Sequence, residues 1–98
     1  MSAKGSLTRG LRVGESLHKE FEIRAATTGD LLDAEADAPV DHRLGFRTAL
    51  LARQIVRLGS LSGPLDFKLL RGLHPADFDE LTRAQQQADE EGNAEPSS

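Results

Sequence analysis

The beginning of the chain alternates between apolar and polar residues with a period of two. Residues 17–25 (LHKEFEIRA) alternate most regularly, with Phe21 and Ile23 on the apolar side and charged residues on the other. Residues 6–13 show a weaker form of the same alternation, and a Gly-Glu-Ser turn signal separates the two stretches. Alternation of this kind is typical of half-buried strands, so the sequence predicts an antiparallel β-hairpin over residues 6–25.

The register of this hairpin depends on the length of its loop. A two-residue loop pairs Val13 with Ser16 and places Leu11 opposite His18, so that an apolar side chain lies beside a polar one. A three-residue loop pairs Val13 with Leu17 instead and gathers both apolar rows on one face. We therefore expect the three-residue loop, because a slip of one residue would turn every side chain to the opposite face.

After the hairpin, the pattern changes from strand-like to helix-like. Thr27 or Thr28 can cap a helix by accepting a backbone N–H with its hydroxyl. If Thr27 is the cap, Asp30 falls at the third helical position, where it favours the positive end of the helix dipole and can complete a capping box. The sequence predicts a short helix over about 28–36, which ends before Pro39. We interpret this corner as architectural and expect no catalytic role for Asp30.

The strongest helical pattern covers residues 42–58, where Asp41 is a good cap and Gly59 a good stop. Apolar or small side chains recur at helical spacing and form a stripe that we expect to face the hairpin. The stripe consists of Leu44, Thr48, Leu51, Ile55 and Leu58.

Two shorter helices are predicted in the second half of the chain. Pro64 opens the first, over 64–71, and Pro75 opens the second, over 75–88. The second helix has acidic residues in its first turns, where the helix dipole favours them. After Leu81 no large apolar residue remains.

These elements predict an α+β fold, with an N-terminal antiparallel β-hairpin packed on three to four α-helices. We expect residues 1–5 to be flexible, 6–88 to form a single small domain, and 89–98 to be a disordered acidic tail. A chain of 98 residues is long enough for one domain with a small core.

Composition narrows the possible functions. The chain has no Cys, so disulfides and thiolate chemistry are excluded. It lacks the apolar run of a signal peptide or of a bilayer-spanning helix, and we expect a soluble, cytoplasmic protein. Net charge is −4, and the excess of negative charge lies after residue 58, in a segment with three Lys/Arg and eight Asp/Glu. Such an acidic half disfavours wrapping of nucleic acid.

No catalytic, metal-binding or cofactor-binding motif is present. His18, His42 and His74 are not at ligand spacing, and we expect them to be solvated or to lie at helix starts. The chain has neither a phosphate-binding glycine loop nor a nucleophile elbow. We therefore expect no enzyme, no metal and no cofactor.

The most informative feature is the arginine-rich helix at 42–58, which has four Arg and no acid. It has two interpretations: a solvated face with ordinary packing, or a protein-binding face with exposed apolar anchors inside a ring of Arg. The acidic final helix could pair with it, within one molecule or between copies. The candidate binding residues are Arg43, Phe46, Arg47, Leu50, Arg53 and Arg57.

The order of elements also resembles that of a known family. The pattern consists of an apolar-Arg strand end, a Thr, a Gly-Asp pair, an apolar pair and a final helix with an Asp-aromatic pair. In this chain the pattern reads Ile23-Arg24, Thr27/Thr28, Gly29-Asp30, Leu31-Leu32, Asp77-Phe78 and Leu81. Over about residues 7–85 the chain resembles the small tail assembly chaperones of Mu-like phages, also called phage tail protein E. It departs from many relatives in its double Thr, which has no Pro beside it.

The resemblance implies a non-enzymatic chaperone. Such proteins bind the long tape measure protein and keep it soluble while tail tube subunits polymerise around it. The resemblance also implies a homo-oligomer in the host cytoplasm, absence from the finished virion and, in many relatives, a longer frameshifted form. From the composition and charge we expect no membrane and no nucleic-acid partner. Two alternatives stay open: a small nucleic-acid-binding regulator that uses the Arg helix against phosphate, and a structural tail component of the virion.

Overall fold

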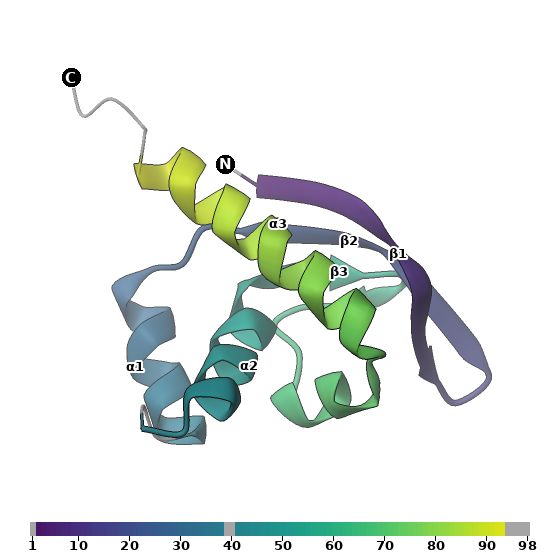
Figure 1. Cartoon of the computed structure of the whole chain (residues 1–98), viewed down its shortest axis with the longest axis horizontal. Helices are drawn as coiled ribbons and strands as arrows, with labels where there is room; N and C mark the ends of the chain where they lie inside the picture. Colours follow the sequence, from purple (N-terminus) through teal and green to yellow (C-terminus); the bar gives the residue numbers. More distant parts are fainter. Residues whose placement is uncertain (1, 39–40, 94–98) are drawn as a thin grey trace.

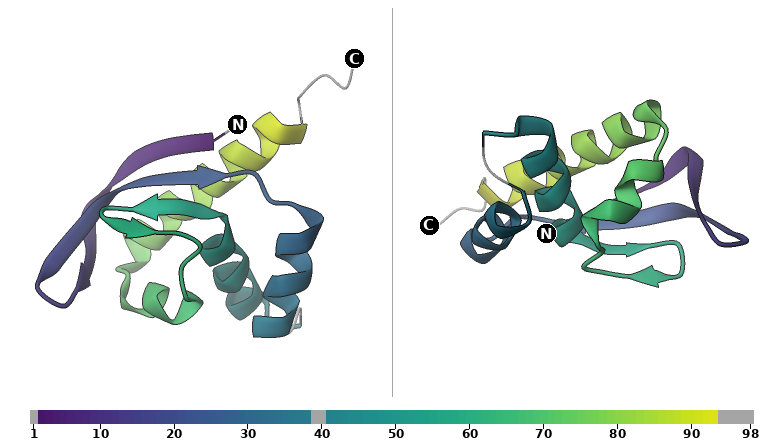
Figure 2. Two further views of the ribbon diagram at one scale, coloured as in Figure 1. Left: turned by 180° about the vertical axis from the view of Figure 1, so that it is seen from behind. Right: turned by 90° about the horizontal axis from the view of Figure 1, so that it is seen from below.

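Four antiparallel strands form a sheet in the order β1-β2-β3-β4; α3 crosses one face of this sheet, and α1 packs beside α2 (Figures 1 and 2). The computed structural model describes residues 2–38 and 41–93. The elements are β1 (Ser2–Val13), β2 (Ser16–Arg24), α1 (Thr28–Asp37), α2 (Arg43–Gln54), β3 (Ile55–Leu58), β4 (Leu61–Ser62), the 3-10 helix η1 (Phe67–Gly72) and α3 (Pro75–Asn93). The predicted α+β class is confirmed.

The register expected for the hairpin is wrong. Val13 pairs with Ser16 and Leu11 with His18, as a two-residue loop requires. Farther along the hairpin, Ser6 pairs with Glu20, so β1 advances five residues while β2 advances two. This irregularity brings the apolar residues of both strands onto one face of the hairpin, an arrangement that was expected to require a longer loop.

The bulge in β1 is held from above by α3. Gly10 adopts a positive φ of 88°, which favours glycine, and lies within the irregular stretch. The carboxylate of Asp77, in the first turn of α3, accepts the backbone N–H groups of Arg9 at 3.2 Å and Gly10 at 2.8 Å. Leu7 and Leu11, on either side of these residues, are both 2% exposed. The bulge therefore keeps both leucines in the core while a buried carboxylate binds the backbone that would otherwise lack partners.

The N-terminal residues are part of the sheet, in contrast to the flexible segment expected over 1–5. Ser2 pairs with Arg24 and Ala3 with Ile23, so the hairpin extends to the first described residue. Ala3 is 5% exposed beneath α3, and this burial accounts for the ordered strand. Met1 lies outside the described residues.

The predicted helix over 42–58 ends early, and its last turn is a strand. α2 stops at Gln54, and Ile55–Leu58 forms β3, which pairs with β2. Ile55 and Leu58 are buried, whereas Val56 is 40% exposed. β-branched residues favour strands, and pairing with β2 satisfies the backbone here better than another helical turn would.

The start of α2 also differs from the expectation. The N-cap is His42 instead of Asp41, and its side chain makes no capping hydrogen bond. Leu44 is 66% exposed, whereas Leu51 is fully buried. The stripe expected to face the hairpin therefore begins only in the second half of the helix.

The helix predicted over 64–71 is a 3-10 helix that starts later, at Phe67. Its cap is Asp66, whose carboxylate accepts the Lys68 backbone N–H at 2.9 Å. α3 continues to Asn93, so the part of the expected tail from residue 89 to residue 93 is helical, and 94–98 lies outside the described residues.

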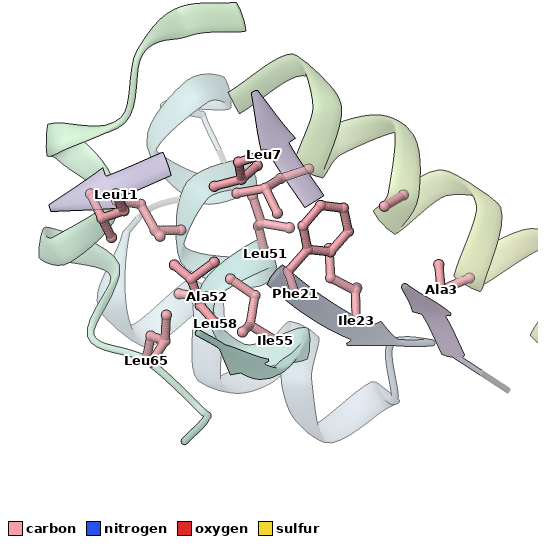
Figure 3. Close-up of a cluster of buried hydrophobic side chains, with 14 residues drawn as sticks. Ala3, Leu7, Leu11, Phe21, Ile23, Leu51, Ala52, Ile55, Leu58 and Leu65 are labelled. Carbon is pink, nitrogen blue, oxygen red and sulfur yellow. The ribbon is translucent and has the colours of Figure 1, made fainter. Parts of the chain in front are cut away.

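The main core lies between the sheet, α2 and α3 (Figure 3). Its most buried large hydrophobic side chains are Ile23, Leu51, Ile55, Leu58 and Leu81. A second, smaller cluster joins α1 to α2 through Ala34, Ala38 and Ala49. In the described part of the chain, no helix combines the length and the apolar character needed to cross a bilayer.

Candidate functional site

Four of the six predicted binding residues line one groove between α2 and α3. The groove has a volume of about 430 Å³. Its α2 wall consists of Arg43, Phe46, Arg47 and Leu50, and α3 contributes Gln85 and Asp89. The structure thus brings together the first two turns of the Arg-rich helix and a part of the acidic helix.

The apolar floor of the groove is shared with the small cluster between α1 and α2. Phe46 and Leu50 are half-buried and pack against Ala34, Ala38 and Ala49. The expectation that they are exposed anchors is therefore only partly met, because one side of each supports α1. Their remaining surface faces the groove and is available to a partner.

Arg43 and Arg47 form the basic rim of the groove. Both side chains are exposed, and neither makes an ion pair within residues 2–38 and 41–93. They are four residues apart, which places them one above the other on the same face of α2. No acid lies on α2, so this face keeps its positive charge.

The other two predicted arginines do not belong to the groove. Arg53 forms ion pairs with Asp37 at 2.9 Å and Asp33 at 3.8 Å, both on α1. Arg57, on β3, lies 3.9 Å from Glu22 of β2. These guanidinium groups pair within the molecule and link neighbouring elements, Arg53 to α1 and Arg57 to β2.

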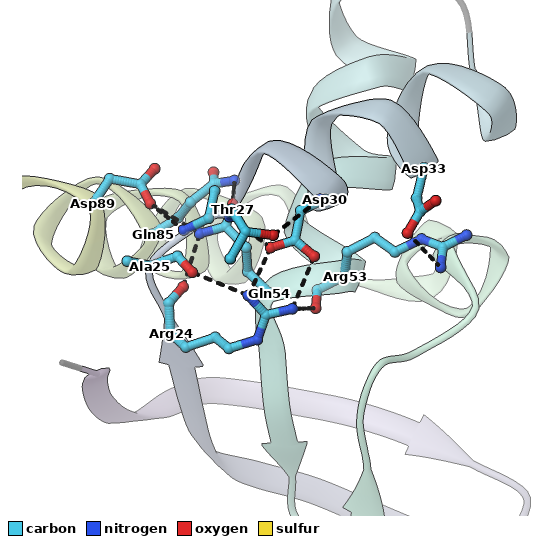
Figure 4. Close-up of polar contacts among 10 residues, drawn as sticks. Arg24, Ala25, Thr27, Asp30, Asp33, Arg53, Gln54, Gln85 and Asp89 are labelled. Atoms are coloured by element: carbon cyan, nitrogen blue, oxygen red, sulfur yellow. Dashed lines mark hydrogen bonds and ion pairs between the residues drawn. The ribbon is translucent and has the colours of Figure 1, made fainter. Parts of the chain in front are cut away.

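The α3 wall of the groove is held by a polar network (Figure 4). Gln54 is fully buried, and its Nε2 donates to the Arg24 carbonyl at 2.8 Å and to Asp89 Oδ1 at 3.0 Å. The same Asp89 oxygen accepts the Ala26 backbone N–H at 2.9 Å. Gln85 donates to Gln54 Oε1 at 2.7 Å. The network fixes the two polar side chains that α3 presents to the groove.

Sequence reasoning missed Gln85 and Asp89 because they lie in a stretch without large apolar residues. A signal was nevertheless present in the small residues. Leu81, Ala84 and Ala88 recur at spacings of three and four and are all buried. This pattern keeps the helix amphipathic up to residue 88, directly before the predicted tail.

The strand-to-helix corner is built as a capping box and a bidentate ion pair. Thr27 is the cap: its hydroxyl accepts the Asp30 N–H at 3.1 Å, and Asp30 Oδ2 accepts the Thr27 N–H at 2.8 Å. Arg24 donates to both Asp30 oxygens, at 2.6 and 2.9 Å, and to the Arg53 carbonyl at 3.0 Å. The hydrogen bonding of Asp30 to Arg24, and to a lesser extent to Thr27, lowers the pKa of Asp30 to about 2. The capping box predicted for this corner, with Thr27 as the cap and Asp30 at the third position, is confirmed.

A second groove, of about 360 Å³, lies on another side of the same half of α2, against η1 and the start of α3. It is lined by Leu44, Thr48, Leu70, Arg71, Leu73, Pro75 and Phe78. Leu44 is the most exposed large hydrophobic residue in the described part of the chain. This groove is more apolar than the first and has only one charged residue in its wall.

The three histidines do not meet. His18 is buried, contrary to the solvated position expected for it, and its Nδ1 accepts the Ser60 N–H at 3.3 Å. His42 caps α2 without a side-chain hydrogen bond, and His74 accepts the Ala76 N–H at 3.0 Å. No group of three His, Cys, Asp or Glu suited to a metal ion occurs in the described ranges.

Comparisons with known proteins identify relatives over most of the chain. The family described as tail assembly protein gp41 matches residues 7–97. The Mu-like prophage FluMu protein gp41 of Haemophilus influenzae is 36% identical over 88 residues, which cover 78% of this chain and 69% of the relative. The probable tail assembly protein gp41 of Escherichia phage Mu is 30% identical over 102 residues, covering 91% of this chain and 69% of that protein.

The same phage has a probable tail assembly protein FS-gp41, which is also 30% identical over 102 residues. The chain covers 53% of it, so it spans about half of that longer protein. No solved structure matches the chain.

Proposed function

The chain belongs to the family of tail assembly protein gp41, and from that premise we propose that it is a non-enzymatic chaperone of phage tail assembly. Its client would be the tape measure protein, which it keeps soluble in the host cytoplasm while tail tube subunits polymerise. It would act as a homo-oligomer and be absent from the mature virion. The two relatives from phage Mu are named as probable tail assembly proteins, which supports the general role.

The observation that carries the proposal is the groove between α2 and α3. A tape measure protein is long and largely helical, so its apolar stripes would aggregate if they stayed exposed. A half-buried apolar floor formed by Phe46 and Leu50, beside the basic rim of Arg43 and Arg47, suits helix-in-groove binding. The groove is preformed, which reduces the ordering cost of binding.

The alternative use of the Arg helix against phosphate receives less support. Arg53 and Arg57 are paired with carboxylates, so only two of the four arginines stay free of ion pairs among the described residues. Two phosphate contacts would give weak binding, because both the affinity and its salt dependence grow with the number of phosphates contacted. A gel shift at roughly 50 mM salt tests this alternative directly.

Co-expression with the tape measure protein of the same phage tests the proposal. We expect the chain to raise the soluble fraction of the tape measure protein and to co-purify with it. The double variant Arg43→Glu/Arg47→Glu should abolish both effects. Arg12→Glu/Arg83→Glu is the matched control, because it changes the net charge equally at two exposed sites away from the groove.

Three outcomes would contradict the proposal. The proposal fails if the tape measure protein is equally soluble without the chain or if both double variants behave alike. It also fails if the chain is found in purified virions. Light scattering after size exclusion would separately measure the number of copies in the free protein.

A further inference from the structure

We propose that the α2–α3 groove selects an amphipathic helix with two carboxylates one turn apart beside its apolar anchors. The inference rests on the proposed function and specifies the chemistry of the client segment. It follows from the arrangement of charge on the two walls of the groove, which differ in sign.

The α2 wall has two parallel rows. Arg43 and Arg47 are four residues apart, and so are Phe46 and Leu50. Residues at this spacing lie above one another on a helix, so the wall presents a basic row next to an apolar row. A client helix lying along α2 meets both rows if its acidic side chains recur at three or four residues beside its apolar stripe. Arg pairs with carboxylates in a planar, two-pronged geometry that lysine cannot reproduce.

The α3 wall carries the opposite charge. Asp89 is half-buried at the groove, and its Oδ1 already accepts hydrogen bonds from Ala26 and Gln54. Asp89 Oδ2 accepts no hydrogen bond within the described ranges. A client carboxylate directed toward this wall would be repelled, whereas an amide or ammonium group could donate to it. The charges therefore fix which flank of the client faces α2.

Helix α1 of a second copy would be a poor occupant. Three of its four carboxylates are paired within the molecule, Asp33 and Asp37 with Arg53 and Asp30 with Arg24. Its remaining acid, Glu35, supplies one carboxylate where the groove offers two arginines. A separate chain with its own acidic row fits better.

Fluorescence anisotropy with designed peptides tests this selectivity. The acidic probe is a labelled helical peptide of roughly 20 residues, with a leucine stripe and two Glu four residues apart along one edge. The basic probe is identical except that both Glu are Lys. We expect the purified full-length chain to bind the acidic probe roughly 5- to 30-fold more tightly at about 50 mM salt. The difference should shrink at about 500 mM salt, because exposed pairs are screened.

Reversal of the rim should reverse the preference. Arg43→Glu/Arg47→Glu should bind the basic probe more tightly than the acidic one, whereas Arg12→Glu/Arg83→Glu should keep the original order. Arg43→Gln/Arg47→Gln should lose the preference for the acidic probe, and circular dichroism should show that all three variants keep the native fold. Equal binding of both probes by the unmodified chain would overturn the inference, as would an unchanged order in the reversed variant. If the rim reversal instead altered only the number of copies in the free protein, the groove would be a self-contact and the inference would fail.

The outcomes separate this inference from the proposed function. Loss of probe discrimination with intact tape measure solubility refutes the charge rule alone. Discrimination between probes without any effect on the tape measure protein refutes the proposed client and leaves the chemistry of the groove in place.

Discussion

Replacement of Asp30 by Asn should destabilise the fold by about 1–2 kcal/mol at neutral pH. The ion pair with Arg24 and the hydrogen bonds from Thr27 lower the pKa of Asp30 from 3.8 to about 2. At about 1.4 kcal/mol per pKa unit, this fall corresponds to roughly 2–3 kcal/mol before solvent screening is considered. The Asp30 side chain is 9% exposed, but that of Arg24 is 39% exposed. Solvent screens the pair, so about 1–2 kcal/mol is the better figure.

The lowered pKa of Asp30 also predicts the direction in which stability changes with pH. Because the folded state has the lower pKa, the stabilisation is complete above about pH 4 and is lost as the pH falls through about 2. Urea titrations at several pH values should show that Asp30→Asn unfolds earlier than the unmodified chain at pH 7. The gap should close toward pH 2.

The matched control is Glu35→Gln, which removes an exposed carboxylate without an ion pair on the same helix. It should unfold like the unmodified chain at every pH. If Asp30→Asn and Glu35→Gln had the same midpoint at pH 7, the corner would not stabilise the fold through the Asp30 charge. A gap that stayed constant down to pH 2 would equally refute the reasoning.

Three further variants test the fold by thermal or chemical unfolding. Thr27→Ala should cost about 1 kcal/mol through loss of the cap, and Thr27→Ser should recover most of it; equal losses would refute a role for the hydroxyl. Gly59→Ala should destabilise the fold more than Gly14→Ala. Both glycines have positive φ, but only at Gly59 would the added methyl clash with the His18 ring, so equal effects would contradict this reasoning. Leu51→Ala should cost about 2–5 kcal/mol, since Leu51 is fully buried, and a loss below about 1 kcal/mol would indicate a looser core.

Local patterns predicted the elements whose cause is local. The α1 cap was predictable because Thr27 and Asp30 lie three residues apart and bind each other's backbone. The hairpin was predictable from its alternation, but its register was not. The bulge that sets the register is stabilised by Asp77, which lies 67 residues beyond Gly10. No pattern within the hairpin contains that information.

The strand β3 was missed for a similar reason. Residues 55–58 continue the helical spacing of α2, so periodicity alone extends the helix. In the structure, β2 offers a pairing partner that ends the helix at Gln54. The same early end separates the predicted binding residues: those up to Leu50 face the groove, whereas Arg53 and Arg57 face other parts of the sheet and α1.

The groove depends on the position of α3, and two carboxylates fix that helix. Asp77 holds its first turn to the bulge of β1, and Asp89 holds a later turn to Ala26 and Gln54. The two anchors are twelve residues apart, which is about 18 Å along a helix. A helix attached at both points cannot swing away from α2 without breaking hydrogen bonds at a buried or half-buried carboxylate, which is costly. The corner that carries the family pattern therefore helps to shape the groove, because its backbone N–H at Ala26 is one of the groups that hold the far wall in place.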